Sequence, residues 1–208
     1  MTRFLRSTAT TMMLIMLASL LAACGSTVTT FPTPSAETPG SQTYTVVDAL
    51  NGTLSFTAPA GLRSHGDTEA GLLTVGTSDA ALSTSAPTAL PAGQWGLAVG
   101  ALPKSVAQTL IPKGQTVTPQ IILDSLKVQM MKSVPQVTFT PSTALTIGGH
   151  EGARLSGTSP QGDVVLLAVT LDNSFLIGTG VVAKGEMPTR EPLLTEIMAS
   201  ATYTSGNK

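Results

Sequence analysis

Cysteine is nearly absent from this sequence: among 208 residues the only one is Cys24. A single thiol cannot form a disulfide within the chain, and it cannot supply the several cysteines of a structural zinc site. The stability of the fold must therefore come from a hydrophobic core, and the chain is long enough to bury one.

Charged residues are also scarce, at 11% of the chain, with 11 Lys and Arg against 12 Asp and Glu. The basic residues are scattered singly along the chain. They form no stripe of the kind that binds phosphate backbones. We therefore predict that nucleic acid is not a partner.

Signals of catalysis are few. The sequence has no Gly-x-Ser-x-Gly elbow, His-Glu-x-x-His motif, phosphate loop or dinucleotide fingerprint. His65 lies near Asp67 in a polar stretch that we interpret as a solvated loop; a metal or acid-base role for this pair is the alternative. His150 precedes Glu151, and neighbours on a strand point to opposite faces, so this pair would not share a ligand. We predict no catalytic residues, no metal site and no cofactor.

Residues 1–23 have the three parts of a signal peptide. Arg3 and Arg6 form the positive region, residues 12–21 form the apolar region, and Ala22 and Ala23 are small residues before a cleavage site. The apolar run is about half of the ~20 residues that a membrane-spanning helix needs. We therefore expect it to be removed rather than to persist as a transmembrane segment.

The order Leu21-Ala22-Ala23-Cys24 resembles the bacterial lipobox. That resemblance implies cleavage before Cys24 and attachment of acyl chains to it. More than one chain is expected, because a single acyl chain binds a membrane only marginally. The protein would then be held at the cell membrane and would face away from the cytoplasm, on the periplasmic or extracellular side. An ordinary secretory signal followed by a chance cysteine is the alternative.

Residues 24–42 are rich in Ser, Thr and Pro and carry almost no side chains that could form a core. Such a segment cannot bury enough apolar surface to offset the entropy of ordering, so we predict a disordered tether. Residues 43–208 are predicted to form a single globular domain.

Alternating or clustered apolar residues, separated by turn signals, predict a domain rich in strands. The turn signals are Asn51-Gly52, the segment 159–162 and Asp172-Asn173. Segment 164–171 is almost entirely apolar and should be covered on both faces, whereas residues 77–93 are predicted to form a long loop. The predicted strands are 44–47, 53–58, 72–76, 95–102, 137–139 and 145–147, followed by a meander of 150–157, 164–171 and 175–182.

One helix is predicted over residues 119–133. Thr118 is a suitable N-cap, Pro119 fits the first helical position, and apolar residues recur from Leu123 to Met130 at spacings of three and four. This apolar face is interpreted as a core-packing stripe.

A last helix is predicted to begin near Pro192, followed by a short polar end at residues 203–208. The apolar residues expected on its buried face are Leu193, Leu194, Ile197, Met198 and Ala201.

The segments "SFTAPAGL" (55–62) and "GGHEGARLSG" (148–157), with a closing helix that ends in Ala-Thr-Tyr, resemble the Mog1/PsbP-like group of proteins. The resemblance implies an α+β fold in which helices pack on a central antiparallel sheet, as an α/β/α sandwich. It also implies accessory roles such as binding or assembly, without enzymatic activity. Leu62 stands where this group has an aromatic residue.

The function favoured by these observations is a lipid-anchored, non-catalytic binding or adaptor module of the cell envelope. A carrier or sensor of an apolar small molecule, held between sheet and helices, is the alternative, and an enzyme ranks last. Trp95, the only tryptophan, is a candidate contact for an envelope protein partner, since aromatic residues dominate interface energetics. Arg154 is a second candidate contact for a partner or ligand.

Overall fold

The computed structural model describes residues 40–48, 52–82, 89–111, 114–134 and 136–206, which form two antiparallel sheets with helices packed on them. The larger sheet has eight strands: in spatial order β3 (Arg63–Asp67), β4 (Leu72–Gly76), β5 (Trp95–Pro103), β10 (Ser174–Val182), β9 (Asp163–Thr170), β8 (His150–Thr158) and β6 (Thr138–Phe139), with β7 (Thr143–Ile147) also paired to β8. The smaller sheet contains β1 (Ser41–Val47), β2 (Thr53–Pro59) and β11 (Thr202–Thr204). The helices are α2 (Asp79–Leu82), α3 (Lys104–Leu110), α4 (Pro119–Ser133) and α5 (Met187–Ser200).

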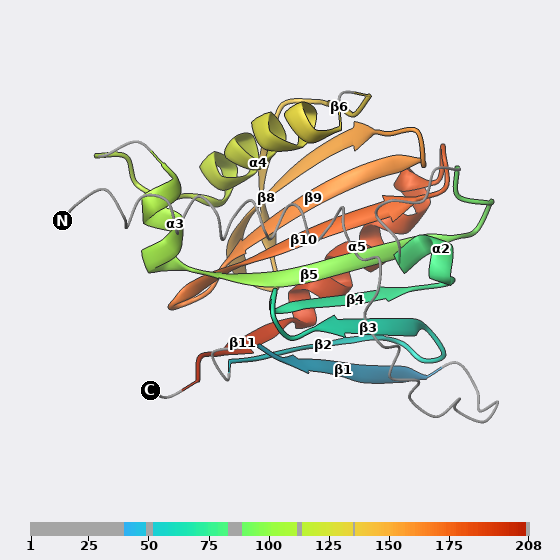
Figure 1. The fold of residues 1–208 in the computed structure, drawn as a ribbon, viewed down its shortest axis with the longest axis horizontal. Helices are drawn as coiled ribbons and strands as arrows, with labels where there is room; N and C mark the ends of the chain where they lie inside the picture. The colour runs from blue at the N-terminus through green and yellow to red at the C-terminus, as the bar shows by residue number, and fades with distance from the viewer. Residues whose placement is uncertain (1–39, 49–51, 83–88, 112–113, 135, 207–208) are drawn as a thin grey trace.

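The large sheet is the central layer (Figure 1). On one face α4 contributes Leu123 to a buried cluster with Ala153 and Leu155 of β8. On the other face α5 and the small sheet share a second cluster, which includes Leu194 and Phe56. The predicted α+β fold, with an antiparallel sheet between helices, is confirmed. A second, separate sheet was not predicted.

Strand β9 is buried on both faces, as its composition predicts. Every residue from Val164 to Val169 is buried. Val165 and Leu167 join the cluster beneath α5, whereas Leu166 and Ala168 join the cluster beneath α4. This strand therefore links the two halves of the core.

The predicted turns of the meander are present. The Ser159 N–H donates to the Gly162 carbonyl at 2.8 Å between β8 and β9, and the Leu171 N–H donates to the Ser174 carbonyl at 2.8 Å between β9 and β10. Asn51, in the predicted turn between β1 and β2, lies outside the described residues.

Helix α4 has the predicted bounds. Thr118 is its N-cap, and the Thr118 Oγ1 accepts a hydrogen bond from the Ile121 N–H at 3.4 Å. Leu123 is fully buried, and Met130 packs against the same cluster. Within the described ranges, no helix is long and apolar enough to cross a membrane.

Helix α5 begins at Met187, so the predicted start near Pro192 was wrong. Pro188 occupies the first turn, where a missing backbone N–H has no consequence. Pro192 lies inside the helix on an exposed side. It has no N–H to donate to the carbonyl one turn earlier, and on this side that carbonyl is close to water. The buried face was predicted correctly, since Leu194, Ile197 and Met198 are all buried.

Two strands lie where polar segments were predicted to be irregular. Residues 63–67, interpreted as a loop, form the edge strand β3, which pairs with β4 and is mostly exposed. The sequence of β3 has no alternation of apolar and polar residues, so it gives no signal of a strand. Likewise, Tyr203 belongs to β11, which pairs with β2, rather than to a polar end.

The first strand begins at Ser41, within the predicted tether. Ser41 pairs with Pro59 and Gln42 pairs with Ala58. The segment 77–93 contains the four-residue helix α2, and the seven-residue helix α3 was not predicted. Both helices are too short to show a helical period in the sequence.

Glycine in β10 lets α5 approach the sheet closely. A Cβ at Gly178 would lie 2.6 Å from the Met198 sulfur, and a Cβ at Gly180 would lie 2.7 Å from a Leu194 methyl carbon. These positions explain the Gly-x-Gly spacing in an otherwise apolar strand.

The C-terminal strand is tied to the first hairpin through Tyr203. The Tyr203 hydroxyl donates to Asp48 Oδ2 at 2.7 Å, and Asp48 Oδ1 accepts from the Gly52 N–H at 2.8 Å. Burial, together with the hydrogen bond to Asp48 and its negative charge, raises the pKa of Tyr203 to about 12 from its ordinary value of 10.0.

We expect Tyr203→Phe to lower the free energy of unfolding by about 1–2 kcal/mol at pH 7, because the Asp48 carboxylate loses its donor. The raised pKa of Tyr203 means that the folded state favours the protonated hydroxyl. The resulting stabilisation is fully present below pH 10 and is lost as the pH rises from about 10 to about 12. Urea unfolding at a series of pH values should therefore show the two proteins converging over that range. Thr202→Ala on the same strand is the control. A difference from wild type that stays constant up to pH 12 would contradict this account.

Candidate functional site

Two clefts share one end of the large sheet as a common wall. Consecutive residues of one strand point to opposite faces of the sheet, so one member of a pair lines one cleft and its neighbour lines the other. Three such pairs come from strands: His150 and Glu151, Val169 and Thr170, and Ser174 and Phe175. Pro103 at the end of β5 lines the first cleft, and Lys104 at the start of α3 lines the second.

The first, the α5-side cleft, lies between this end of the sheet, the end of α5 and β11, and has a volume of about 670 Å³. Its lining combines apolar side chains with hydroxyl, amide and imidazole groups. The apolar members include Ile147, Val169, Leu171 and Met198, and the polar members include His150, Asp172, Asn173, Ser174, Tyr203 and Ser205.

His150 and Asp172 both line the α5-side cleft, but they make no hydrogen bond or ion pair with each other in the described part of the chain. A catalytic histidine needs a group that orients its imidazole. The Tyr203 hydroxyl, also in this cleft, is engaged with Asp48. Neither Asp172 nor Tyr203 therefore orients the His150 imidazole in this structure.

The second, the α3-side cleft, lies on the other face of the sheet and has a volume of about 550 Å³. Lys104, at the start of α3, holds its ammonium 5.8 Å from the centre of the buried Phe175 ring. Glu151 lines the same cleft. The prediction that His150 and Glu151 point to opposite faces is thus supported by their different clefts, although the role of Glu151 in a cleft was missed.

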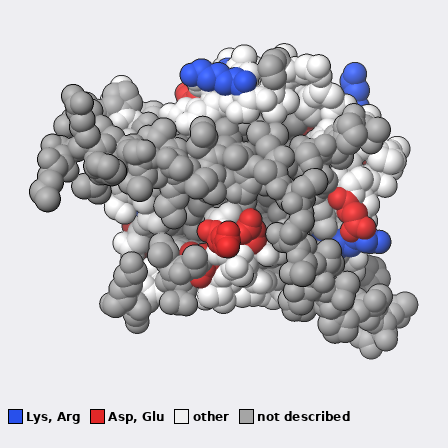
Figure 2. Space-filling view, viewed as in Figure 1, with Lys and Arg blue, Asp and Glu red and all other residues white. Residues whose placement is uncertain are grey.

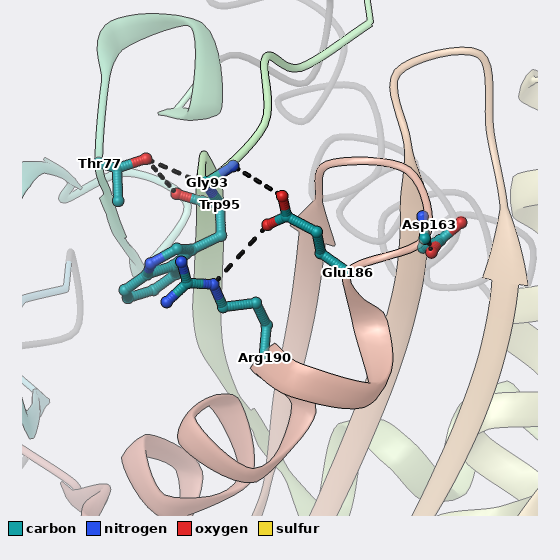
Figure 3. Close-up of polar contacts among 7 residues, drawn as sticks. Thr77, Gly93, Trp95, Asp163, Glu186 and Arg190 are labelled. Carbon is teal, nitrogen blue, oxygen red and sulfur yellow. Dashed lines mark hydrogen bonds and ion pairs between the residues drawn. The ribbon is translucent and has the colours of Figure 1, made fainter.

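The other end of the sheet is closed by polar contacts around the start of α5 (Figure 3). Glu186 accepts from the Gly93 N–H at 2.8 Å and lies 3.9 Å from Arg190, and Asp163 accepts from the Gly185 N–H at 2.8 Å. These contacts join α5 to the loops of the sheet, so their role is structural.

Trp95 lies at this closed end and is only 3% exposed. Its backbone N–H donates to Thr77 Oγ1 at 3.0 Å, and its indole belongs to the cluster beneath α5. The prediction of Trp95 as a partner contact does not fit this position, because a partner could reach the ring only if the core opened.

Arg154 lies on β8 and forms an ion pair with Glu191 of α5. The Glu191 side chain is 19% exposed, so the pair is partly shielded from water. Arg154 therefore ties the sheet to α5, and a ligand would have to displace Glu191 to reach its guanidinium.

His65 and Asp67 lie on the exposed edge strand β3 and make no hydrogen bond or ion pair with each other. Asp67 Oδ1 accepts from the N–H groups of Glu69 at 3.0 Å and Ala70 at 2.9 Å, which caps the turn into β4. Within the described ranges, no group of three His, Cys, Asp or Glu side chains could hold a metal ion. Cys24 lies outside the described residues.

The face in Figure 2 is mostly uncharged where it is described. Acidic side chains form a small group near its centre and a second group near its right margin, beside a basic side chain, and the other basic side chains lie apart from one another near the upper margin. No continuous basic surface is visible among the described residues of this face.

Lys104, Glu151, Thr170 and Phe175 were not predicted as a site. They come from separate strands and a short helix, and no spacing along the chain relates them. The one available signal was the alternation along β8, which places Glu151 on the opposite face from His150.

Neither a family model nor a curated protein sequence matches this chain. Among solved structures, cyanobacterial PsbP (CyanoP) from Synechocystis sp. PCC 6803 is similar over 88% of this chain and 99% of its own, with a TM-score of 0.52 and 13% identity. LpqN, described as involved in cell envelope biogenesis of Mycobacterium tuberculosis, is similar over 79% of this chain and 91% of its own, with a TM-score of 0.46 and 14% identity. The likeness to CyanoP shows that this chain has a PsbP-like fold.

Proposed function

We propose that this protein is a lipid-anchored, non-catalytic binding module of the cell envelope. The proposal is supported by the lipobox-like order before Cys24 and by the signal peptide pattern in residues 1–23. Acyl chains on Cys24 hold the protein to the membrane. The 15 residues 25–39 then connect the anchor to the first described residue, Gly40.

The α5-side cleft is the proposed recognition surface. The observation that carries this choice is the combination of an apolar floor with a polar rim in one open cleft of about 670 Å³. Apolar surface supplies binding energy, and a small number of polar groups fixes the orientation of the ligand. Trp95 has no part in this surface because it is buried at the other end of the sheet.

A carrier of a small molecule with an apolar part is the second candidate. This candidate is favoured by Val169 and Met198, which are buried, line the cleft and also belong to the cluster beneath α5. If the protein is an adaptor, a side chain of its partner occupies this part of the cleft. If it is a carrier, the small molecule occupies it.

Replacing Cys24 with Ala should release the protein from the membrane, because the sulfur that accepts the acyl chain is absent. Membrane and soluble fractions of the native host, compared by immunoblot, measure this effect. Ser26→Ala is the matched control and should remain with the membrane. An unchanged membrane fraction for Cys24→Ala would contradict lipid anchoring.

A photo-crosslinking residue at Asn173, an exposed position in the α5-side cleft, should capture a discrete protein partner in native membranes. The same residue at Lys184, exposed near the other end of the sheet, is the control. Equal capture at both positions, or capture at neither, would count against an adaptor that binds through this cleft.

The carrier candidate predicts an added mass of a few hundred daltons in native mass spectrometry of the full-length protein purified from its host. Thr204→Trp should reduce this added mass, because an indole at this exposed lining position fills part of the cleft. Thr189→Trp, exposed on the first turn of α5, should retain it. A clean apo mass in wild type would leave the adaptor as the favoured candidate.

A further inference from the structure

The α3-side cleft contains a row of side chains across three neighbouring strands. Phe175 of β10 pairs with Thr170 of β9, and Gly152 of β8 pairs with Val169 of β9. The strands are antiparallel, so Glu151, the residue before Gly152, comes opposite Thr170. All three members of this row line the cleft, and Lys104 lies above Phe175. The row runs across this end of the sheet beside α3, whose position is visible in Figure 1.

Thr170 occupies the middle of the row, and its hydroxyl oxygen is buried with no hydrogen-bond partner in the described part of the chain. Buried polar atoms are almost always paired, but an oxygen without accessible surface cannot be touched by a ligand in the cleft. Thr170 therefore contributes to the wall of the cleft, and its hydroxyl is not a ligand contact.

The two ends of the row carry opposite charges that do not neutralise each other. Among the described residues, neither the Lys104 ammonium nor the Glu151 carboxylate forms an ion pair. Strands that are separated by one other strand lie about 10 Å apart, which leaves room for a ligand between the charged groups. The Phe175 ring beneath the Lys104 ammonium helps to hold that charge at one end.

We propose that the α3-side cleft binds a small zwitterion whose ammonium and carboxylate are several bonds apart, as in a dipeptide. The ligand carboxylate contacts Lys104, its ammonium contacts Glu151, and the uncharged middle of the ligand lies over Thr170. A ligand with charge of only one sign would leave Lys104 or Glu151 unused. The site lies on the other face of the sheet from the proposed recognition surface and does not depend on lipid anchoring.

The test uses isothermal titration of the full-length protein with L-alanyl-L-alanine, its N-acetyl derivative and its C-terminal amide. We expect saturable binding of the free dipeptide and about tenfold weaker binding of each capped form, which has lost one charge-assisted contact. No saturable binding of the dipeptide at about 10 mM would overturn the proposal, as would equal affinity for all three compounds.

Charge-removing variants assign the two ends of the ligand. Glu151→Gln should weaken dipeptide binding about tenfold and abolish the preference for the free dipeptide over its N-acetyl form. Lys104→Met should do the same for the preference over the amide. His150→Gln and Asp172→Asn, both in the α5-side cleft, are controls that should bind as wild type. Variants at Glu151 and Lys104 that keep both preferences would overturn the proposal.

Thr170→Val is a control within the cleft, because the Thr170 hydroxyl is buried. Removing an unpaired hydroxyl should raise the melting temperature of the ligand-free protein. The same variant should bind the dipeptide as wild type does, and a loss of binding as large as that of Glu151→Gln would overturn the assignment of the two charged contacts. The lipid-anchoring and crosslinking experiments report on other residues, so their failure can be distinguished from failure of this site.

Discussion

Strand β9 is apolar on both faces, and the positions of the surrounding layers follow from how those faces are covered. One face requires α4, and the other requires α5 together with the small sheet. A strand of this kind cannot lie at a surface, because its exposed apolar side chains would cost about 25 cal/mol for each Å² left in water. The neighbouring strands β8 and β10 share this environment and complete the middle of the sheet.

The layers do not cover the two ends of the sheet equally. At one end, Glu186 and Asp163 accept hydrogen bonds from loop N–H groups and hold the start of α5 against the strands. At the other end a cleft lies on each face of the sheet. The alternation of side chains along each strand then gives these clefts different chemistry, although their lining residues are neighbours in the chain.

The elements that were predicted well have strong local signals. Helix α4 has an N-cap, a proline at its first position and an apolar stripe, and β9 is a continuous apolar run. The start of α5 was misplaced because Pro192 is ordinarily a start signal and here lies within the helix. Strand β3 was missed because its backbone is held by β4 while its side chains remain exposed, so it has no apolar pattern.

The sequence by itself determined the strands of the meander, the long helix and the fold class, because local hydrophobic periodicity and turn chemistry specify these features. It also supplied the prediction of an anchor at Cys24, which depends on a contiguous motif. Only the tertiary structure decided that Trp95 is buried and that Arg154 pairs with Glu191. It alone brought Lys104, Glu151 and Thr170 to one cleft. Such sites depend on strand register and layer packing, and these join residues that no spacing along the chain relates.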